Sequence, residues 1–523
     1  MIRLSFLLLT CMGIGLQSFA QQSCPVIPLP DQYEKAGGHF LLNDGTAIVA
    51  AEPSLEATAH MLQQQLLRYA GIRVSIQPAA SGNAIILKRE KNNNPEAYTL
   101  HMNSRTVTIS AGGDAGIFYG AVSLLQLVRA KQEAAGIPCW NIRDTPLYRW
   151  RGFMLDESRQ FFGKQEVKKI LDEMAFYKLN RFHWHLTDDP GWRIEIRQYP
   201  RLALVGGIGS FHDSTAPAQY YTQQDVEEIV AYAAARHITV IPEIDMPGHA
   251  RAANRAYPEF SGGGSPRYPD FTFNPGKEET YQYLTNILKE VDALFPSQMI
   301  HIGGDEVSFG SQAWNSDAAV QRLMQKEQLN SLVQVEHYFL KRMADTLLKL
   351  NNDVLGWDEV TESALPSKKT IVFWWRHDKP EQLTSAVEKG YRVVLCPRLP
   401  FYFDFVQDST NLKGRRWRGG AYNPLKDVYD FTLKGLPASV QQSKLVEGVQ
   451  ANLWSETIVS DQRMYYLTFP RLLAFAEAAW TKPVKRDYAQ FEKRLEAFLP
   501  LLRKEGIYYY NVLDPKLTPE AAE

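Results

Sequence analysis

Between residues 150 and 456 the sequence repeats one pattern, a short apolar segment that ends in polar residues and is usually followed by a helical pattern. The segments are RGFMLDESR (151–159), RFHWHLTDD (181–189), ITVIPEIDMPGH (238–249), MIHIGGDE (299–306), DVLGWDE (353–359), TIVFWWR (370–376), RVVLCP (392–397) and VQANLWSE (449–456). Eight strands that alternate with helices predict an α/β fold, a (β/α)8 TIM barrel. An open, doubly wound sheet is the alternative fold for the same pattern.

The stretches between these segments carry the spacing of amphipathic helices. Residues 164–178 place their apolar side chains on one face, and residues 222–237 begin with a capping box formed by Thr222 and Asp225. Only residues 360–369 separate the fifth segment from the sixth. A parallel crossover normally needs a dozen or more residues, so this connection has little room for a helix.

Residues 24–145 have a different pattern, which predicts a smaller α+β unit. Strands are expected at 46–50, 72–77 and 84–88, helices at 54–71 and 114–129, and a hairpin at 98–110. We therefore divide the chain into a signal peptide (1–20), an N-terminal α+β domain (21–145), a barrel (146–505) and a C-terminal tail (506–523).

The N-terminus has the features of a secretory signal peptide. Arg3 precedes an apolar stretch at 4–16, and Ser18-Phe19-Ala20 fits a cleavage site. The pattern predicts export to the periplasm or the extracellular space. Cys24 is not preceded by the apolar residue that a lipoprotein signal needs, so lipid attachment is not expected. No later run is long and apolar enough for a membrane span.

Overall charge and cysteine content exclude several classes of protein. The chain has 57 basic and 58 acidic residues, so its net charge of −1 gives no reason to expect nucleic acid as a partner. Once Cys11 is removed with the signal, Cys24, Cys139 and Cys396 remain. This odd number at irregular spacing predicts neither a disulfide scaffold nor a zinc ribbon. Whether Cys24 pairs with Cys139 is open.

In a (β/α)8 barrel the residues at the carboxyl ends of the strands carry the chemistry. His183 and His185 form an H-x-H motif at one such end, and with His249 and Asp305 they could bind a metal in a metal-dependent hydrolase. A single H-x-H is a weak signal. We interpret His183 and His185 as structural and expect no metal.

The segment MIHIGGDE places two acids, Asp305 and Glu306, side by side. Most glycosidases use two carboxylates that flank the sugar bond, and adjacent residues cannot easily do so. RGFMLDESR, FHWHLTDD, PEIDMPGH, HIGGDE, GWDE, YFD (402–404) and LWSE (453–456) resemble, in this order, the motifs of the family 20 glycoside hydrolases, the β-N-acetylhexosaminidases. The resemblance extends from residue 24 to about residue 500.

The resemblance implies a task for each of the adjacent acids. In that family the acetamide of the substrate is the nucleophile, so no second carboxylate is needed across the ring. Glu306 matches the general acid. Asp305 matches the residue that accepts the acetamide N–H and stabilises an oxazolinium-like intermediate. Asp305 then has to be ionised while Glu306 is protonated.

Polar residues at other strand ends match groups that hold the sugar. Arg159 resembles the arginine that binds ring hydroxyls through its fork of donors. Tyr402 resembles the hydroxyl that orients the acetamide oxygen. Asp404 and Glu456 resemble acceptors for the sugar hydroxyls.

The remaining matches concern the walls of the site and the residues behind the acids. Trp357, Trp375 and Trp454 would enclose the acetamide and stack on the sugar, and Trp374 could replace Trp375. Asp188 and His249 resemble a relay behind Glu306, with Asp245 as a further site residue.

Together these observations predict an exported, exo-acting, retaining β-N-acetylhexosaminidase that uses no cofactor. Its partner would be a glycan with a terminal N-acetylhexosamine. Two alternatives are a lacto-N-biosidase-like member of the same family and a non-catalytic sugar-binding protein on the same fold.

Overall fold

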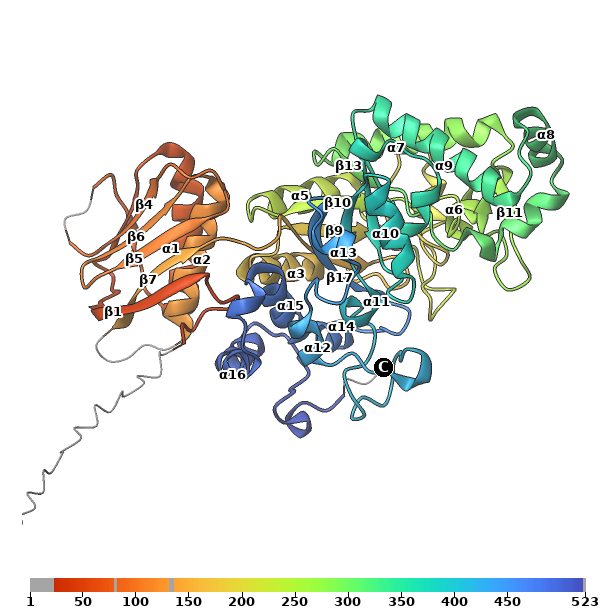
Figure 1. Cartoon of the computed structure of the whole chain (residues 1–523). Coiled ribbons are helices and arrows are strands. Elements are labelled where there is room, and N and C mark those ends of the chain that lie inside the picture. Colours follow the sequence, from red (N-terminus) through yellow and green to blue (C-terminus); the bar gives the residue numbers. More distant parts are fainter. Residues whose placement is uncertain (1–22, 80–81, 131–135, 521–523) are drawn as a thin grey trace, which may run out of the picture.

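A computed structural model describes residues 23–79, 82–130 and 136–520, which form two domains (Figure 1). The predicted signal peptide lies outside the described residues and stays a prediction. In the part of the chain that is described, no helix is both long enough and apolar enough to cross a membrane. Cys24, Cys139 and Cys396 are buried and free, so Cys24 and Cys139 are not joined by a disulfide.

The N-terminal domain is a seven-stranded sheet with the strand order β1-β7-β5-β6-β4-β2-β3. Its strands are β1 (Gln32–Phe40), β2 (Ala47–Ala50), β3 (Ser75–Ile76), β4 (Ala84–Arg89), β5 (Tyr98–Met102), β6 (Thr106–Ala111) and β7 (Ile137–Asp144). The predicted hairpin is the antiparallel pair β5–β6. The sequence did not indicate β1, because most of its side chains are exposed and lack an apolar alternation.

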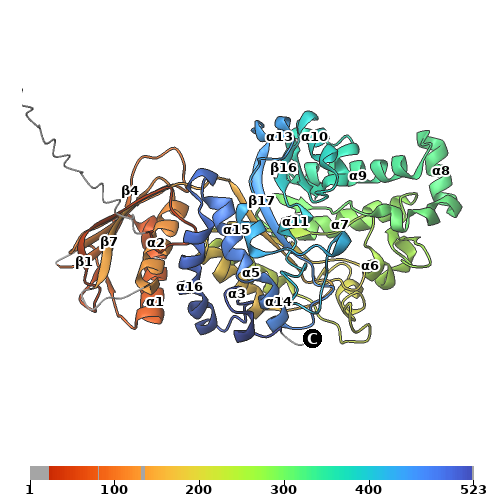
Figure 2. The same ribbon diagram turned by 60° about the horizontal axis from the view of Figure 1, so that its bottom comes forward.

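The two predicted helices of this domain are α1 (Glu56–Ala70) and α2 (Asp114–Ala130). Gly71 ends α1 in a left-handed conformation with φ of 69°, which a glycine adopts without strain. Figure 2 shows both helices between the sheet and the barrel. The Gln126 amide of α2 donates a hydrogen bond of 2.8 Å to the Phe176 carbonyl of the barrel, so this polar side chain is satisfied where the domains meet.

The second domain contains a closed parallel barrel, in the order β10-β13-β14-β15-β16-β17-β8-β9. Its strands are β8 (Trp150–Asp156), β9 (Arg181–His185), β10 (Thr239–Glu243), β13 (Met299–His301), β14 (Asp353–Trp357), β15 (Thr370–Trp374), β16 (Arg392–Leu395) and β17 (Val446–Leu453). Each of the eight predicted segments contributes one strand. The (β/α)8 prediction is confirmed, and the closed barrel excludes the open sheet.

Helices surround the barrel, except at one connection. They are α3 (Lys164–Phe176), α4 (Arg201–Leu204), α5 (Gln223–Ala234), α6 (Arg251–Ala256), α7 (Glu278–Leu294), α8 (Ala318–Glu327), α9 (Leu332–Lys349), α10 (Pro380–Glu388), α11 (Arg398–Phe401), α12 (Leu425–Asp430), α13 (Ala438–Gln441), α14 (Asp461–Thr468), α15 (Arg471–Trp480) and α16 (Tyr488–Lys504). The predicted capping box is present at the start of α5. Between β14 and β15 the chain, described throughout, forms only the 3-10 turns η5 (Asp358–Glu362) and η6 (Ser367–Lys369).

A short two-stranded sheet, β11 (Ser261–Gly263) with β12 (Thr272–Phe273), lies in the long connection between β10 and β13. After α16 the chain turns back onto the barrel domain, where the Tyr510 N–H donates to the Phe469 carbonyl at 3.1 Å. The Arg463 guanidinium binds Glu520 at 2.6 Å. The described part of the predicted C-terminal tail is therefore packed against the barrel domain.

Candidate active site

A cavity of about 520 Å³ lies at the carboxyl end of the barrel strands. It is lined by Arg159, His249, Asp305, Glu306, Trp357, Trp375, Arg398, Tyr402, Phe405, Arg415, Arg416, Trp417, Arg418, Trp454 and Glu456. Several of these residues come directly at or after the end of a strand, as Trp357 does in β14 and Trp454 after β17. The barrel thus brings residues from distant parts of the sequence to one rim.

The two glycines of MIHIGGDE allow the turn that presents the adjacent acids. Gly303 and Gly304 have φ of 65° and 88°. A Cβ on Gly303 would lie only 1.7 Å from Asp245 Oδ1, so a side chain there would collide with that carboxylate. Glu306 itself has a left-handed backbone with φ of 51°. A non-glycine residue in this conformation is strained, and such strain is concentrated at functional sites.

His249 lies beside both acids. Its Nε2 is 3.6 Å from Asp305 Oδ2 and 3.7 Å from Glu306 Oε2, and its Nδ1 is 2.9 Å from Asp188 Oδ1. Asp188 also binds Arg159 at 2.6 Å. The two acids differ in exposure, since the Asp305 side chain is 12% exposed and that of Glu306 is 33% exposed. Glu306 is therefore the acid that faces the open side of the cavity.

Burial and charge shift the pKa values of this group in different directions. Burial raises the pKa of Asp305 to about 7, and the neighbouring Glu306 adds to this effect while His249 opposes it. Burial alone would lower the pKa of His249, but Asp188 and Asp305 raise it well above its usual value. Burial would raise the pKa of Asp188, but Arg159 and His249 hold it well below its usual range. His249 is thus a cation between carboxylates.

Asp245 lies behind the adjacent acids and does not line the cavity. It is buried, and its Oδ1 accepts a hydrogen bond of 3.4 Å from the Gly304 N–H. Burial, and then the charge of Asp305, raise the pKa of Asp245 well above its usual value. Asp245 is therefore held mainly in its neutral form. It supports the Gly303-Gly304 turn and cannot contact a ligand in the cavity directly.

Aromatic side chains form one wall of the cavity. The rings of Trp375 and Tyr402 lie parallel within 9°, with their centres 6.3 Å apart, and Trp454 packs against Trp357 at 5.7 Å. The indole N–H of Trp375 donates to Glu359 at 3.0 Å, which fixes the orientation of the ring. Trp374 donates to the Lys379 carbonyl and packs in the core outside the cavity. The pocket residue of the WW pair is thus Trp375.

The polar residues predicted to hold the sugar lie beside this wall. Arg159 is fixed by Asp156 and Asp188, and its guanidinium lies 5.0 Å from the Trp454 ring centre. Asp404 lies behind the wall, and Arg415 Nη1 is 3.4 Å from both Asp404 and Glu456. Burial raises the pKa of Asp404 to about 7, although Arg415 opposes this shift.

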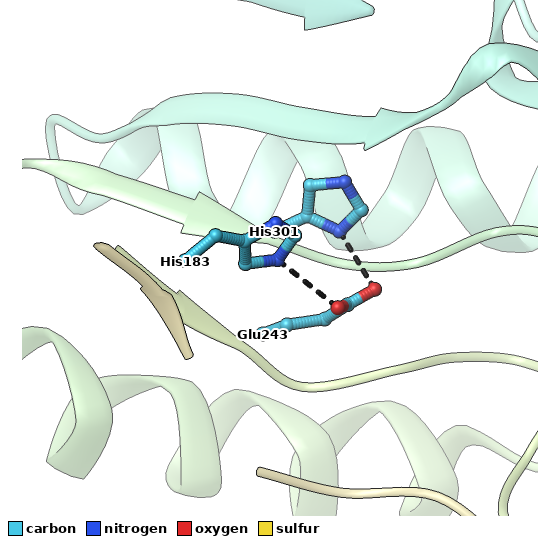
Figure 3. A group of neighbouring side chains, drawn as sticks. All are labelled: His183, Glu243 and His301. Atoms are coloured by element: carbon cyan, nitrogen blue, oxygen red, sulfur yellow. Dashed lines mark ion pairs between the residues drawn. The ribbon is translucent and has the colours of Figure 1, made fainter. Parts of the chain in front are cut away.

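A cluster of ionisable groups lies in the barrel core beneath the aromatic wall (Figure 3). His183 Nε2 is 3.0 Å from one oxygen of Glu243, and His301 Nδ1 is 2.9 Å from the other. The Trp357 indole donates to Glu243 at 2.9 Å. The same carboxylate also contacts His185, which continues to Asp188 at 3.0 Å. Glu243 thus connects an aromatic wall residue with the group around His249.

The positive and negative side chains around Glu243 balance one another. Burial would lower the pKa of His185, but Glu243 and Asp188 raise it well above its usual value, whereas burial lowers the pKa of His183 to about 4. A cationic His185 therefore neutralises the Glu243 carboxylate. Both histidines of the H-x-H motif contact Glu243, so they do not converge with His249 and Asp305 as the metal-hydrolase alternative requires.

The structure brings the predicted site residues together in two layers. Arg159, His249, Asp305, Glu306, Trp357, Trp375, Tyr402, Trp454 and Glu456 line the cavity, and Asp188, Asp245 and Asp404 lie directly behind it. Sequence reasoning missed Arg398, Phe405, Arg415, Arg416, Trp417 and Arg418. Four of these occur in GRRWRGG (414–420), where a basic run around a tryptophan was the available signal.

Comparisons with known proteins show which family this chain resembles. The family model described as glycosyl hydrolase family 20, catalytic domain, matches residues 148–483, and the model for domain 2 of that family matches residues 23–145. A β-hexosaminidase of Porphyromonas gingivalis is 36% identical over 93% of this chain, which spans 64% of that relative's length.

Solved structures resemble the whole described fold. An exo-β-N-acetylglucosaminidase of Vibrio harveyi, in complex with N-acetylglucosamine, superposes with a TM-score of 0.86 and 32% identity, covering 94% of this chain and 79% of that one. A β-N-acetylhexosaminidase of Bacteroides fragilis superposes with a TM-score of 0.80 and 30% identity, covering 92% of this chain and 96% of that one.

Proposed function

Because the chain belongs to glycosyl hydrolase family 20, we propose that it is an exo-acting, retaining β-N-acetylhexosaminidase that removes terminal N-acetylhexosamine from glycans. The observation that carries this proposal is the placement of Asp305 and Glu306 on one turn, both beside His249. Retaining enzymes that supply their own nucleophile place two carboxylates on either side of the bond, ~5–5.5 Å apart. Adjacent acids suit a reaction in which the substrate's acetamide attacks.

In the first step Glu306, the more exposed acid, donates a proton to the leaving oxygen. The acetamide oxygen bonds to the anomeric carbon as the bond to the leaving group breaks. Asp305 accepts the acetamide N–H and stabilises the positive charge of the oxazolinium ring. The Tyr402 hydroxyl, at the aromatic wall, donates to the acetamide oxygen and orients it. Glu306 then removes a proton from water, which attacks the anomeric carbon from the side of the departed group as the bond between that carbon and the acetamide oxygen breaks.

The remaining contacts hold one sugar at the inner end of the cavity. Trp357 and Trp454 are buried and close this end, which suits a single terminal residue and hence exo action. Arg159 and Glu456 offer a donor fork and an acceptor for ring hydroxyls. His249 and Asp188 act as positioning residues, because His249 lies beside Glu306 and Asp305 and Asp188 holds His249 from behind.

We further propose that the chain works outside the cytoplasm, in the periplasm or the extracellular space. This rests on the predicted signal peptide at residues 1–20 and the absence of the lipoprotein pattern before Cys24. The glycan is the expected partner, and the reaction as written requires neither a cofactor nor nucleic acid.

The experiment is a comparison of 4-nitrophenyl β-glycosides of N-acetylglucosamine, N-acetylgalactosamine and glucose, with the product anomer followed by NMR. We expect turnover of the acetamido sugars with retention and negligible turnover of the glucoside. Equal turnover of the glucoside would overturn the acetamide mechanism. Preferential release of an intact disaccharide from an aryl lacto-N-bioside would support the lacto-N-biosidase alternative, and no turnover at all would support a binding protein.

A further inference from the structure

The outer part of the cavity is strongly basic on one side. Arg398, Arg415, Arg416 and Arg418 line it together with Trp417, and all five come from the connection between β16 and β17. We refer to Arg398, Arg416, Trp417 and Arg418 as the basic rim. The proposed reaction does not use any of these four residues.

Acidic partners do not neutralise the basic rim. Arg398 and Arg418 share one carboxylate, that of Asp378, each at a distance of 3.7 Å. Among the described residues Arg416 has no carboxylate partner; its guanidinium contacts only the Asn411 carbonyl, at 3.4 Å, and the Tyr422 ring. Three cations therefore face one acid. By contrast, Arg159 and Arg415, which also line the cavity, each face two carboxylates.

The basic rim borders the same cavity as the proposed general acid. Arg398 and Glu306 both line this cavity, so a group that leaves past Glu306 meets the rim. The Arg398 guanidinium lies between two indoles, 4.4 Å from the Trp375 ring centre and 4.0 Å from that of Trp417. The basic rim thus continues the aromatic wall, on the side of the cavity where we place the leaving group whose oxygen Glu306 would protonate.

Trp417 and Arg418 are both accessible from solvent. Trp417 is partly exposed, and the Arg418 side chain is 81% exposed, with its guanidinium 5.1 Å from the Trp417 ring centre, from which a ligand would have to displace it. An indole face stacks on a sugar ring, and a guanidinium fork matches the two oxygens of a carboxylate or a sulfate. Together they offer a platform for a sugar ring and donors for an anionic group attached to it.

Building on the proposed function, we propose that the preferred substrates carry a negative group, carboxylate or sulfate, on the sugar next to the cleaved bond. Trp417 stacks on this sugar, and Arg398, Arg416 and Arg418 bind its anionic group. The basic rim is then the specificity determinant for the leaving-group side. The terminal N-acetylhexosamine itself stays neutral.

The test compares three disaccharides that share a terminal β-linked N-acetylglucosamine and differ only in the reducing sugar, which is glucose, glucuronate or glucose 6-sulfate. At low salt we expect at least one charged disaccharide to be favoured about tenfold in kcat/KM over the neutral one. The two charged arms distinguish carboxylate from sulfate. The preference should shrink as salt is raised, because the basic rim is exposed to solvent.

Substitutions in the basic rim test whether it causes the preference for charged disaccharides. Arg416→Gln combined with Arg418→Gln should remove most of the charged-to-neutral preference in kcat/KM and leave only the part due to Arg398, whereas Arg418→Lys alone should retain most of it. Arg322→Gln on α8, at the far edge of the molecule in Figure 1, changes the net charge without touching the cavity and should keep the ratio. A ratio of one in the unmodified protein, or a ratio that the double substitution leaves unchanged, would overturn the inference.

The aryl N-acetylglucosaminide separates this inference from the proposed function. If it is hydrolysed and the three disaccharides are cleaved equally, the proposed function stands and the inference about the rim is wrong. If neither the aryl glycoside nor any disaccharide is hydrolysed, both are wrong.

Discussion

The cavity at the carboxyl end of the barrel strands has a volume of about 520 Å³, whereas a cavity of about 870 Å³ lies at the opposite end, between the barrel and the N-terminal domain. Both are lined by arginines, by at least one carboxylate and by at least one aromatic side chain. In the interdomain cavity, however, Glu96 is already bound by Arg151 at 2.8 Å and by Asn180 at 3.0 Å.

Unsatisfied polar atoms distinguish the two ends. At the carboxyl end His249 Nε2, Asp305 Oδ1 and Glu456 Oε2 are buried without a hydrogen-bond partner, among the described residues. Among the described lining residues of the interdomain cavity, only Arg181 Nε is in this state. Buried polar groups without partners are costly, so a cluster of them marks a place that a ligand completes. Volume alone would have pointed to the wrong end.

The largest expected effect comes from the more exposed acid at the carboxyl end. Glu306→Gln should lower kcat by ~10²–10⁴-fold on substrates with poor leaving groups, because proton donation in the transition state is lost. Aryl glycosides with acidic phenols should lose much less in the first step. The measurement is kcat/KM across a series of leaving groups. An equal loss across the series would show that Glu306 is not the acid.

The next largest effect is expected at Glu243, the buried carboxylate beneath the aromatic wall. Glu243→Gln would remove one of the two carboxylates that balance the charge of His185 in the barrel core and leave only Asp188, so the free energy of unfolding should fall by ~3–5 kcal/mol. Glu96→Gln at the interdomain cavity is the matched change. It should cost less, because the Glu96 side chain is 18% exposed and Arg151 keeps other acceptors. Chemical denaturation measures the free energy of unfolding of both variants. An equal loss in Glu243→Gln and Glu96→Gln would contradict the distinction between the two ends of the barrel.

Asp305→Asn removes the charge that acts only as the acetamide becomes positive. The loss should be ~2.7–4 kcal/mol of transition-state stabilisation, or ~10²–10³ in kcat. KM should change far less, because Arg159, Glu456 and the aromatic wall still bind the sugar. Steady-state kinetics on an aryl N-acetylglucosaminide separate the two parameters. A raised KM with kcat near that of the unmodified protein would make Asp305 a binding residue only.

The pH dependence of kcat/KM follows from the burial of Asp305. Its carboxyl has a pKa of about 7 and has to be ionised to act, so kcat/KM should fall as pH drops through about 7. Far below this value the fall approaches tenfold per pH unit, since each unit removes nine-tenths of the remaining anion. Asp305→Asn should abolish this acidic limb in its residual activity. An identical limb in the variant would assign the titration to another group.

Much of the fold could be predicted because the barrel strands are short apolar runs with polar ends, and strand β14 of the sequence DVLGW is a direct example. Strand β1 could not, because it is an exposed strand whose partner β7 lies about a hundred residues away in the sequence. The site residues that follow strands were likewise predictable. The GRRWRGG loop was not, because it lies far from a strand end and reaches the cavity only through the packing of a long connection; Arg398, which directly follows the predicted segment RVVLCP, was overlooked.

The burial of two acids, Asp305 and Glu243, has consequences that the sequence alone did not reveal. The sequence identifies Asp305 as a group that has to be ionised, yet its surroundings favour the neutral form until the pH approaches about 7. Glu243 was one acid among many at the strand ends, and its contacts with three histidines and Trp357 depend on four strands that meet at the barrel axis.

The smallest expected effect lies at the interdomain cavity, where Arg149→Gln is the informative change. Arg149 is exposed and lines this cavity, and within the described part of the chain its side chain has no acidic partner. Removal of its charge should therefore change the free energy of unfolding by no more than ~0.5 kcal/mol. Hydrolysis should also be nearly unchanged, with kcat/KM within about twofold, because the barrel core separates Arg149 from Asp305 and Glu306 and distant sites act independently. Thermal unfolding and aryl glycoside kinetics measure both quantities. A loss of kcat/KM above tenfold with unchanged stability would show that the larger cavity is coupled to the reaction, and the contrast between the two ends of the barrel would then fail.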